Sequence, residues 1–564
     1  MEWIRSPARW LPVVVVAALL ALGALLFGPQ RVAELASVVR PAPEMRDLPA
    51  AAAWSLLRMT GAYVASLLFA WVFGAWAAAS PRVARVVLPL LDVGQSVPVL
   101  GFFPAAIYLF VTLLGGGRLG LELAAMFLIF TSQVWNLAFA VYEGLTTIPH
   151  ETRAATRALG VRGVLLWRTL YVPACIPALV YNSILSWANG WYFLIACEII
   201  VAGPVQYDLP GLGSMLARSL AEGQLNVAIA ALATLIGIVL ALEAVFWRPV
   251  RAWSRRFRYD TSGTDEEDPA RFLPEFGLPL LIRPVRAAVR ALWRRLPLDS
   301  ANLAVGAAGA GLARAWRVAR WPVWAGLVAA LVFAAISVAD ALAPPWPPAA
   351  AELPGKLLLS FLRINAAYVL ALAWVIPVAM WASDHPRGMR WLSTAAQVGA
   401  SIPATAFFPV LVALLVDRFG GMEVISIVLA LTGMQWYLLF NVLAGVQRVP
   451  GDLRESLRSL GLSQREIHRR LVLPACMPSL VTGSVVAWGG TWNALILSEY
   501  VVYRDHVYQV AGIGSALNHA VFESGERTML FLSLALIVIT VVSFNRIVWA
   551  RLYRVVQERY QLEG

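Results

Sequence analysis

Long apolar runs are the feature of this sequence that most restricts its fold. Segments of about 20 residues with almost no charged side chain recur along the 564-residue chain, and each is long enough to cross the hydrocarbon core of a bilayer as an α-helix. Hydrophobic residues make up 60% of the sequence and charged residues 14%, whereas a soluble domain carries about a quarter charged residues. We therefore predict an all-α polytopic membrane protein that lies in the lipid bilayer.

The apolar runs fall into two groups of six, separated by an arginine-rich stretch at residues 251–320 that we predict to be a soluble linker. A basic amphipathic helix is expected within it at 281–296, either in the headgroup region or packed on the protein. The first run could be a signal peptide, but no cleavage site of small residues follows it promptly, so we interpret it as a retained helix. The twelve predicted spans lie at 11–28, 56–79, 84–113, 120–142, 174–202, 224–247, 321–343, 357–382, 390–416, 421–445, 475–502 and 527–548.

Arginine placement predicts the orientation of these spans. A net charge of +12 is also compatible with nucleic-acid binding, but the arginines lie in short segments beside the apolar runs, which is the pattern of cytoplasmic loops. If each run crosses once, Arg5, Arg82, Arg387 and Arg546 all fall on one side. We therefore expect both termini in the cytoplasm and no nucleic-acid partner.

The second half of the sequence repeats the first at a nearly fixed spacing. The matched positions include prolines, glycines, tryptophans and an acidic residue, too many in one register to be coincidence. Because six crossings return the chain to its starting side, the two halves should have the same orientation. Pairs 305 residues apart are Pro81 and Pro386, Gly94 and Gly399, and Pro98 and Pro403; pairs 301 apart are Gly160 and Gly461, Pro173 and Pro474, Trp191 and Trp492, and Glu198 and Glu499.

Each half contains a basic amphipathic segment between two spans, at residues 150–173 and 451–474, which we call the first and second helical hairpins. Each is too polar to cross a membrane and is predicted to form two short helices on its surface. A shared glycine permits a tight turn or a left-handed backbone between them, and a shared proline suits the start of the next span. A basic loop that only sets topology is the alternative, but two matched copies favour docking of a two-fold partner. The shared residues are Gly160, Pro173, Gly461 and Pro474.

The helical hairpins resemble the cytoplasmic EAA loop of binding-protein-dependent ABC importer permeases, which have the type I fold. That pattern is Glu-Ala-Ala, then a glycine, then a Leu-Pro pair. The second hairpin has Glu455, Gly461 and Leu473-Pro474, whereas the first has Ala154-Ala155-Thr156 where the leading acid is expected. The proline-rich early segment, the Trp-rich fifth helix that ends in a glutamate and the Gly-Leu-Gly motif are similar to those of the nitrate/sulfonate/taurine group.

The resemblance implies two permease domains, at residues 1–250 and 321–564, joined by a cytoplasmic linker at 251–320. It also implies two cytoplasmic ABC ATPase subunits, one at each hairpin, and an extracytoplasmic substrate-binding protein. ATP and Mg would be bound by the partner subunits, and no cofactor or metal by this chain. The residues expected to contact the ATPases are Arg153, Ala154, Ala155, Arg157, Gly160, Pro173, Glu455, Arg458, Gly461 and Pro474.

The sequence independently argues against an ATP site in this chain. A phosphate-binding loop needs Gly-x-x-x-x-Gly-Lys followed by Ser or Thr. The single lysine, Lys356, follows Gly355 but precedes Leu357 and has Ala350 at the first glycine position. The chain is therefore expected to be a transport subunit and not an enzyme.

Six residues of the fifth and eleventh spans are candidates for the translocation path. The glutamates either line or gate the path or hydrogen-bond to a neighbouring helix, because an ionisable group facing lipid costs several kcal/mol. The tryptophans either contact the solute or serve as packing and interfacial residues, and the asparagines are polar groups at similar depth. The candidates are Asn189, Trp191, Glu198, Trp492, Asn493 and Glu499.

Two other classes of protein are compatible with parts of this pattern. A twelve-helix secondary transporter also has two parallel halves, but it would need coupling groups at mid-membrane, where the spans are nearly free of charge. A membrane enzyme would need a metal cluster or a nucleophile–base pair, and the five histidines are scattered in loops and span ends. The resemblance implies import of a small anionic solute, without choosing among nitrate, sulfonates, bicarbonate and others.

Overall fold

The computed structural model describes residues 43–257 and 342–560, apart from 98, 203–204, 504–505, 525 and most of 103–117 and 402–420. The predicted span 11–28, nearly all of the predicted span 321–343 and nearly all of the linker, with its predicted amphipathic helix, lie outside these residues. The described residues are mainly helical, as the apolar runs predicted.

The two halves contain the same elements in the same order. In the first half these are α3 (Leu48–Ala79), α4 (Pro81–Ser96), α6 (Arg118–Thr146), α7 (His150–Ala158), α8 (Gly163–Leu166), α9 (Val172–Glu198), β1 (Ile199–Ala202), β2 (Val205–Asp208), α10 (Leu212–Ala221), α11 (Leu225–Leu242) and α12 (Arg248–Ser254). In the second half they are α15 (Leu353–Asp384), α16 (Pro386–Ser401), α18 (Met422–Gln447), α19 (Gly451–Ser459), α20 (Gln464–Ile467), α21 (Leu473–Ser498), β3 (Tyr500–Tyr503), β4 (His506–Gln509), α22 (Ile513–Asn518), α23 (Arg527–Phe544) and α24 (Ala550–Tyr560).

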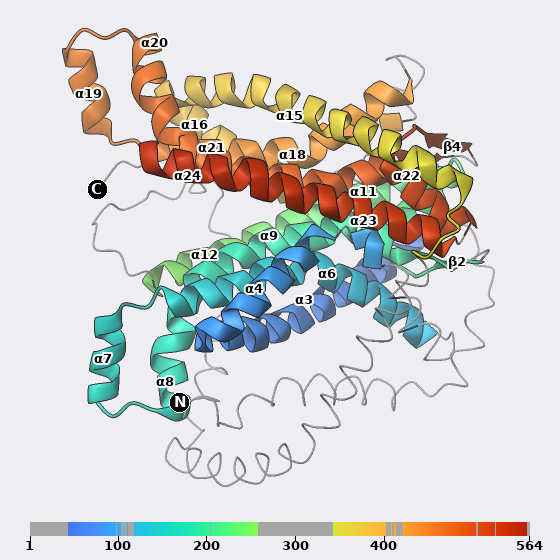
Figure 1. Cartoon of the computed structure of the whole chain (residues 1–564), viewed down its shortest axis with the longest axis horizontal. Coiled ribbons are helices and arrows are strands. Elements are labelled where there is room, and N and C mark those ends of the chain that lie inside the picture. Colours follow the sequence, from blue (N-terminus) through green and yellow to red (C-terminus); the bar gives the residue numbers. More distant parts are fainter. Residues whose placement is uncertain are drawn as a thin grey trace.

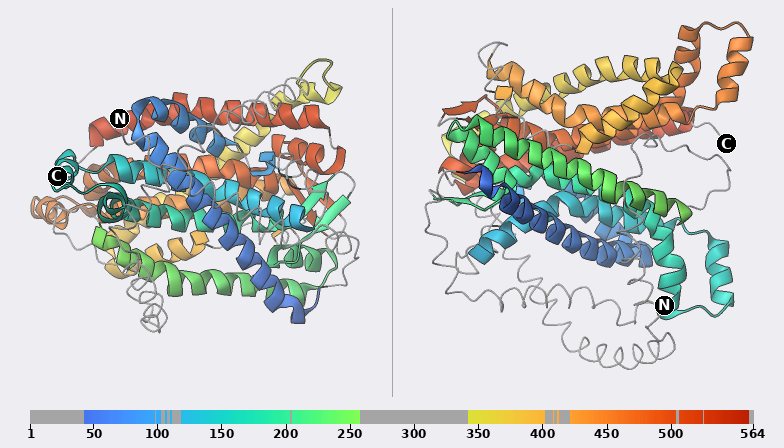
Figure 2. Two further views of the ribbon diagram at one scale, coloured as in Figure 1. Left: turned by 90° about the horizontal axis from the view of Figure 1, so that it is seen from below. Right: turned by 180° about the vertical axis from the view of Figure 1, so that it is seen from behind.

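Both helical hairpins project from the same end of the molecule, and the strands lie at the opposite end (Figure 1). The view from behind shows the same arrangement, with the first half in blue to green and the second in yellow to red (Figure 2). We call these ends the hairpin end and the strand end. The arrangement agrees with the prediction that the two halves have the same orientation.

Eight helices in the described part of the chain are long and apolar enough to cross a membrane. The predicted continuous span at 84–113 is wrong, because α4 is a 16-residue helix that ends at Ser96 and is followed by an extended Val97. Val97 precedes Pro98, and a residue before proline disfavours the helical conformation. The span predicted at 390–416 begins in α16, another 16-residue helix, and most of its remainder lies outside the described residues.

Short antiparallel strand pairs replace the ends of two predicted spans. The helices expected at 174–202 and 475–502 end at Glu198 and Ser498. The apolar residues that follow pair as strands, with Ile199 opposite Asp208 and Tyr500 opposite Gln509. A short apolar run rich in β-branched residues has no helical period, so length and hydropathy alone extended the helix too far.

Pro173 and Pro474 do not begin separate helices, contrary to the prediction. A π-helical turn at Trp167–Tyr171 joins α8 to α9 without a break, and Val172 N donates to Trp167 O. The second half has the same turn at His468–Val472. Proline has no N–H and its ring crowds the carbonyl four residues earlier, so the wider turn allows the helix to continue through it.

Small residues let the spans of each half pack closely. A Cβ atom at Gly74 of α3 would lie 2.6 Å from Ala138 O and 2.9 Å from Val141 Cβ, both on α6. One at Gly144 of α6 would lie 2.7 Å from Cys175 Cα on α9. Cys175 and its repeat mate Cys476 are free and buried.

The two halves meet through exchanged contacts. The short helix α4 contacts α23 of the second half, and α16 contacts α11 of the first. Among the described residues, two hydrogen bonds cross between the halves: Tyr437 Oη donates to Asn189 Oδ1 at 3.0 Å, and Val99 N donates to Asn493 Oδ1 at 2.9 Å. We call this contact region the seam.

Replacing Gly74 by alanine should destabilise the protein, because the new methyl group meets the backbone of α6. The expected loss is about 1–3 kcal/mol, the usual cost of overpacking. Gly237→Ala is the matched control, since a Cβ there meets nothing within 4 Å. Thermal unfolding of the purified chain in detergent measures both. Equal melting temperatures for the two variants would contradict the close approach of α3 and α6.

Candidate functional site

A buried carboxylate ends the fifth span of the first half. Glu198 is fully buried, and its Oε1 accepts hydrogen bonds from Ser55 Oγ at 2.6 Å and Arg58 Nη1 at 2.8 Å. Its Oε2 accepts from Gly213 N at 2.7 Å. These partners belong to α3 and to the first turn of α10, so one side chain joins three elements.

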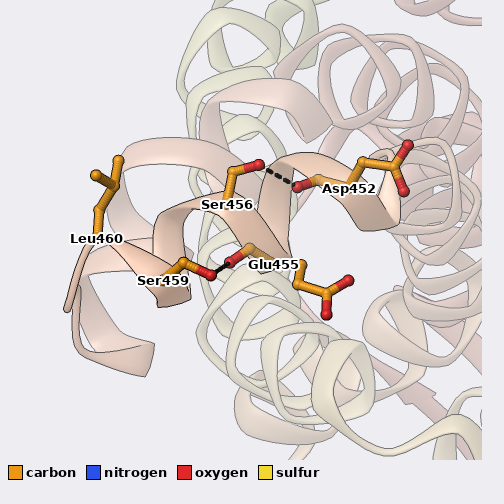
Figure 3. Close-up of a pocket in the computed structure, with 5 residues that line it drawn as sticks. All are labelled: Asp452, Glu455, Ser456, Ser459 and Leu460. Atoms are coloured by element: carbon orange, nitrogen blue, oxygen red, sulfur yellow. Dashed lines mark hydrogen bonds between the residues drawn. The ribbon is translucent and has the colours of Figure 1, made fainter.

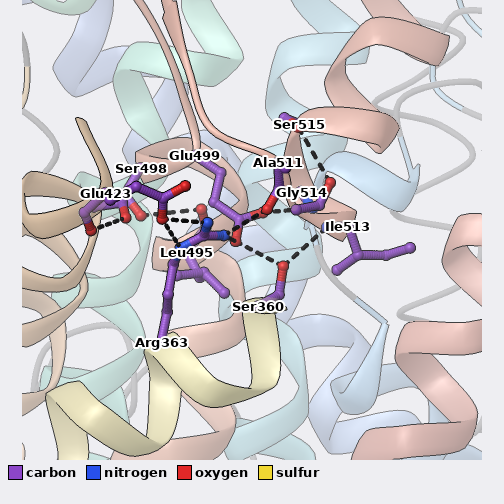
Figure 4. A network of polar contacts seen from close by, with 12 residues as sticks. Ser360, Arg363, Glu423, Leu495, Ser498, Glu499, Ala511, Ile513, Gly514 and Ser515 are labelled. Atoms are coloured by element: carbon purple, nitrogen blue, oxygen red, sulfur yellow. Dashed lines mark hydrogen bonds and ion pairs between the residues drawn. The ribbon is translucent and has the colours of Figure 1, made fainter. Parts of the chain in front are cut away.

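The second half repeats this arrangement (Figure 4). Glu499 is also fully buried, and its Oε1 accepts from Ser360 Oγ at 2.6 Å and Arg363 Nη1 at 2.8 Å. Gly514 N donates to its Oε2 at 2.8 Å. The same three kinds of donor therefore satisfy the carboxylate in both halves.

Each buried arginine also contacts a second carboxylate. Arg58 donates to Glu122 of α6 through Nε at 2.5 Å and Nη2 at 2.9 Å. Arg363 donates to Glu423 of α18 through Nε at 3.0 Å and Nη2 at 2.5 Å. Each arginine thus lies between two carboxylates. The backbone N–H groups at the starts of α10 and α22 stabilise the negative charge of the buried acid, as helix N-termini do for anions.

The Gly-Leu-Gly and Gly-Ile-Gly segments make room for these carboxylates. A Cβ atom at Gly211 would lie 2.2 Å from Glu198 Oε1, and one at Gly512 would lie 2.1 Å from Glu499 Oε2. Only glycine allows the acid to come this close to the backbone at those positions. The Gly-Leu-Gly and Gly-Ile-Gly motifs therefore form part of the surroundings that enclose Glu198 and Glu499.

Sequence reasoning missed most members of these clusters. Their spacing was available as a signal, because the arginines and serines recur 305 residues apart and the second acids 301 apart. The contacts also favour one of the two alternatives for the glutamates, since every described partner is a structural group of a neighbouring element. The missed residues are Ser55, Arg58, Glu122, Ser360, Arg363 and Glu423.

The other path candidates divide into two groups. Asn189 and Asn493 lie at the seam and accept the two hydrogen bonds that cross it. Trp191 and Trp492 are 0% and 1% exposed and pack within their own halves, each against the tryptophan one turn earlier at ring distances of 6.4 and 5.8 Å. These contacts favour the packing interpretation of the tryptophans.

The hairpin glycines have the left-handed backbone that the sequence predicted. The φ angle is +73° at Gly160 and +80° at Gly461, just beyond the ends of α7 and α19. Val161 N donates to Thr156 O and Leu462 N to Leu457 O, each at 3.2 Å, which closes the end of each first helix. A Cβ at either glycine would meet nothing within 4 Å, so only the backbone angle requires glycine.

Arg153 faces the bundle instead of standing outward with the rest of its hairpin. Its guanidinium donates to Leu145 O at the end of α6. Its repeat mate Arg454 donates to Val446 O and Ser383 O, each at 2.9 Å. Burial lowers the pKa of Arg454, an effect opposed by the nearby Asp384 carboxylate, and an arginine keeps its charge in either case. Both arginines thus hold the first helix of a hairpin to the spans.

The outer face of α19 forms a shallow surface pocket lined by two acids, two serines and a leucine (Figure 3). Ser456 Oγ donates to Asp452 O at 2.7 Å and Ser459 Oγ to Glu455 O at 3.0 Å, so both hydroxyls turn back onto the helix. The repeat positions in α7 are Glu151, Ala154, Ala155, Ala158 and Leu159. The two hairpins therefore present different faces at corresponding places.

A polar cluster holds the second hairpin to its span and has no equivalent residues in the first. His468 Nε2 lies 3.0 Å from Asp384 Oδ2, and Gln464 also donates to Asp384. The corresponding residues of the first half are Trp167, Ala79 and Gly163. The second hairpin is thus tied to α15 by polar contacts as well as by Arg454.

Comparison with known proteins gives the family. Residues 70–259 and 375–559 each match the model of the binding-protein-dependent transport system inner membrane component. The chain belongs to this family. Two matches in one chain confirm a fused, two-domain permease with the type I importer fold, as the helical hairpins predicted.

Curated relatives of this transport family are permeases. The chain is similar to a putative ABC transporter permease of Methanocaldococcus jannaschii, 28% identical over 29% of this chain and 58% of that protein. It is similar to a nitrate import permease of Leptolyngbya laminosa, 25% identical over 26% of this chain and 50% of that protein. A taurine transport system permease of Escherichia coli is 29% identical over 26% of this chain and 51% of that protein. The chain thus matches about half the length of these relatives.

Replacing Arg58 by methionine should destabilise the chain strongly, because it leaves Glu198 buried without its counter-charge. Breaking a buried ion pair costs about 3–5 kcal/mol, and the melting temperature in detergent should fall accordingly. Arg46→Met is the control, since Arg46 pairs with Glu44 in solvent, with the two side chains 77% and 52% exposed, and such pairs contribute about 0–1 kcal/mol. Adding Glu198→Gln to Arg58→Met should restore part of the loss. No difference between Arg58→Met and Arg46→Met would show that the cluster does not hold the fold.

Proposed function

We propose that this chain is the transmembrane subunit of an ATP-driven importer in which the two halves form a pseudo-dimeric path for a small anionic solute. The observation that carries the proposal is the pair of matched helical hairpins at one end of the molecule (Figure 1). Membership of a binding-protein-dependent transport family supports it, and so do relatives named as nitrate and taurine permeases.

The hairpins are built to transmit movement into the spans. The second helix of each hairpin continues through a π-helical turn into the fifth span of its half, so that Gln464–Ser498 is one unbroken helix. The first helix is held to the preceding span by Arg153 or Arg454. A partner that displaces a hairpin therefore moves α9 or α21, which carry Asn189 and Asn493 at the seam.

Two cytoplasmic ABC ATPases are the proposed partners at the hairpin end, one for each hairpin, with ATP and Mg bound on those subunits. A substrate-binding protein would dock at the strand end, outside the cell membrane. The helices α12 and α24, at the ends of the last described spans of the two halves, lie toward the hairpin end (Figure 1). Their position supports a cytoplasmic C-terminus. This chain is proposed to bind no cofactor of its own and no nucleic acid.

The difference between the hairpins bears on how the ATPases are bound. The leading acid of the loop is present as Glu455 in α19, whereas α7 has Ala154 at that position. We therefore propose that the second hairpin contributes the stronger electrostatic contact. The exposed leucines Leu159 and Leu460, 81% and 74% exposed, supply a similar apolar contact on both sides.

Gly461→Val should uncouple the second hairpin without affecting membrane insertion. A β-branched residue at positive φ is strained by about 1–3 kcal/mol, which corresponds to a loss on the order of ten- to a hundred-fold in the docked conformation. ATP-dependent uptake and the recovered ATPase should fall by that order. Gly451→Val in the same helix is the control, because Gly451 has no positive φ and open space around it.

Affinity purification of the full chain from its native membrane tests the assembly directly. Recovery of an ABC ATPase and a binding protein with the chain, and uptake that requires ATP, would support the proposal. A chain recovered alone that accumulates solute when only a proton gradient is imposed would replace it with the secondary-transporter alternative.

A further inference from the structure

Two side chains at the contact of α6 and α9 are among the buried polar groups with no hydrogen-bond partner in the part of the chain that the structure describes. They are Gln133, whose amide nitrogen and oxygen are both unpaired, and Ser186, whose hydroxyl is unpaired. Both side chains are 0% exposed. A buried polar group left without a partner costs about 1–3 kcal/mol, so such groups usually have a reason to be present.

Both residues lie near the midpoints of membrane spans, where no water compensates for the missing bonds. Gln133 is central in α6 and Ser186 is central in α9. A Cβ atom at Gly190 would lie 2.3 Å from Gln133 Nε2, so the amide lies directly on the backbone of α9. Ser186 is one helical turn before Gly190 and therefore on the same side of α9. The unpaired groups thus share the contact between α6 and α9.

The second half shows that the fold does not require these polar groups. The residues at the positions 301 further on are Met434, Ala487 and Thr491 in place of Gln133, Ser186 and Gly190. Thr491 donates its hydroxyl to Ala487 O at 2.6 Å. Apolar side chains and a satisfied threonine fill the same space there. The polar groups of the first half therefore reduce stability without serving the packing.

The donors at this point suit a small oxoanion. Gln133 offers two N–H groups and Ser186 one O–H, while the carboxylates of α6 and α9 lie toward the span ends, at Glu122, Glu143 and Glu198. The oxygens of a nitrate or sulfonate group accept hydrogen bonds, and these N–H and O–H groups would donate to them. Asn189, next to Gly190, accepts the hydrogen bond from Tyr437 across the seam, whereas the Gly190 side of α9 faces Gln133 of α6 and Met59 of α3 within the first half.

We propose that Gln133 and Ser186 hydrogen-bond the transported oxoanion as it passes the membrane midplane. Solute sites of transporters commonly lie at that depth. The inference rests on the proposed function, since it names the residues of the first half that meet the solute. In this structure α6 and α9 cover the two groups, and movement of α9 through its hairpin would uncover them.

Uptake by the full complex in proteoliposomes tests the proposal, with nitrate and taurine as the probes. Gln133→Met and Ser186→Ala install the residues of the second half. Each should raise the melting temperature or leave it unchanged, and each should lower uptake about tenfold, the effect of losing hydrogen bonds totalling about 1.4 kcal/mol. Met434→Gln is the reciprocal control, expected to lower the melting temperature while uptake stays within about twofold. Unchanged uptake in Gln133→Met would overturn the proposal and leave the importer function standing.

A thiol placed at the same position gives a second measurement, which follows access to the site instead of uptake. Gln133→Cys should react with the small sulfonate reagent methanethiosulfonate ethylsulfonate when ATP drives the complex, and nitrate or taurine should slow the reaction. Met434→Cys is the control and should stay unreactive, like the buried native cysteines. Equal reactivity of the two variants, or none in either, would contradict a solute contact at Gln133. Reaction of Gln133→Cys with no dependence on ATP would contradict the covered position of the two groups and leave the importer function standing.

Discussion

An arginine buried between two carboxylates is the interaction on which the described part of each half depends. Arg58 is 1% exposed and joins α3 to α6 through Glu122 and to α9 through Glu198. Removing such ions from water costs several kcal/mol each, and the cost is offset only when the remaining donors and acceptors are satisfied. Here Ser55 and the first backbone N–H groups of α10 complete the set. The strand end of each half is therefore held as one unit.

The magnitudes of the contacts indicate where the molecule can move. Breaking the buried ion cluster costs about 3–5 kcal/mol in each half, whereas a single neutral hydrogen bond such as Tyr437 to Asn189 contributes about 0.5–1.5 kcal/mol. The buried ion cluster therefore restricts opening of each strand end more than this hydrogen bond restricts movement at the seam. At the other end, the unbroken helix from hairpin to span gives a partner a rigid element to act on.

The two halves share the same strand-end cluster, whereas they differ at other repeat positions. The serine, arginine, acid and glycine of each strand-end cluster recur at their repeat positions, and each takes part in holding the buried acid. The differences lie elsewhere: at matched repeat positions, Glu455 corresponds to Ala154, His468 to Trp167, and Met434 to Gln133. These differing positions lie on the helical hairpins or at the middle of the spans, where the proposed partners and solute would be met.

Much of the architecture was predictable because a bilayer leaves an apolar run of about 20 residues little choice but a helix. The register of the repeat also located the hairpins, their left-handed glycines and the common orientation of the halves. The strand pairs after Glu198 and Ser498 were missed, since four apolar residues have no readable period. The π-helical turns before Pro173 and Pro474 were missed because the prolines looked like helix starts.

The order of residues alone was enough to predict a duplicated bundle of membrane helices with a polar hairpin in each half, because hydrophobicity and spacing are local properties of a sequence. Which polar groups are satisfied became known from the three-dimensional structure. Glu198 finds Arg58 from 140 positions away, whereas Gln133 finds no partner among the described residues. The residue types alone do not distinguish these outcomes, because a hydrogen bond depends on which helix faces lie together in space.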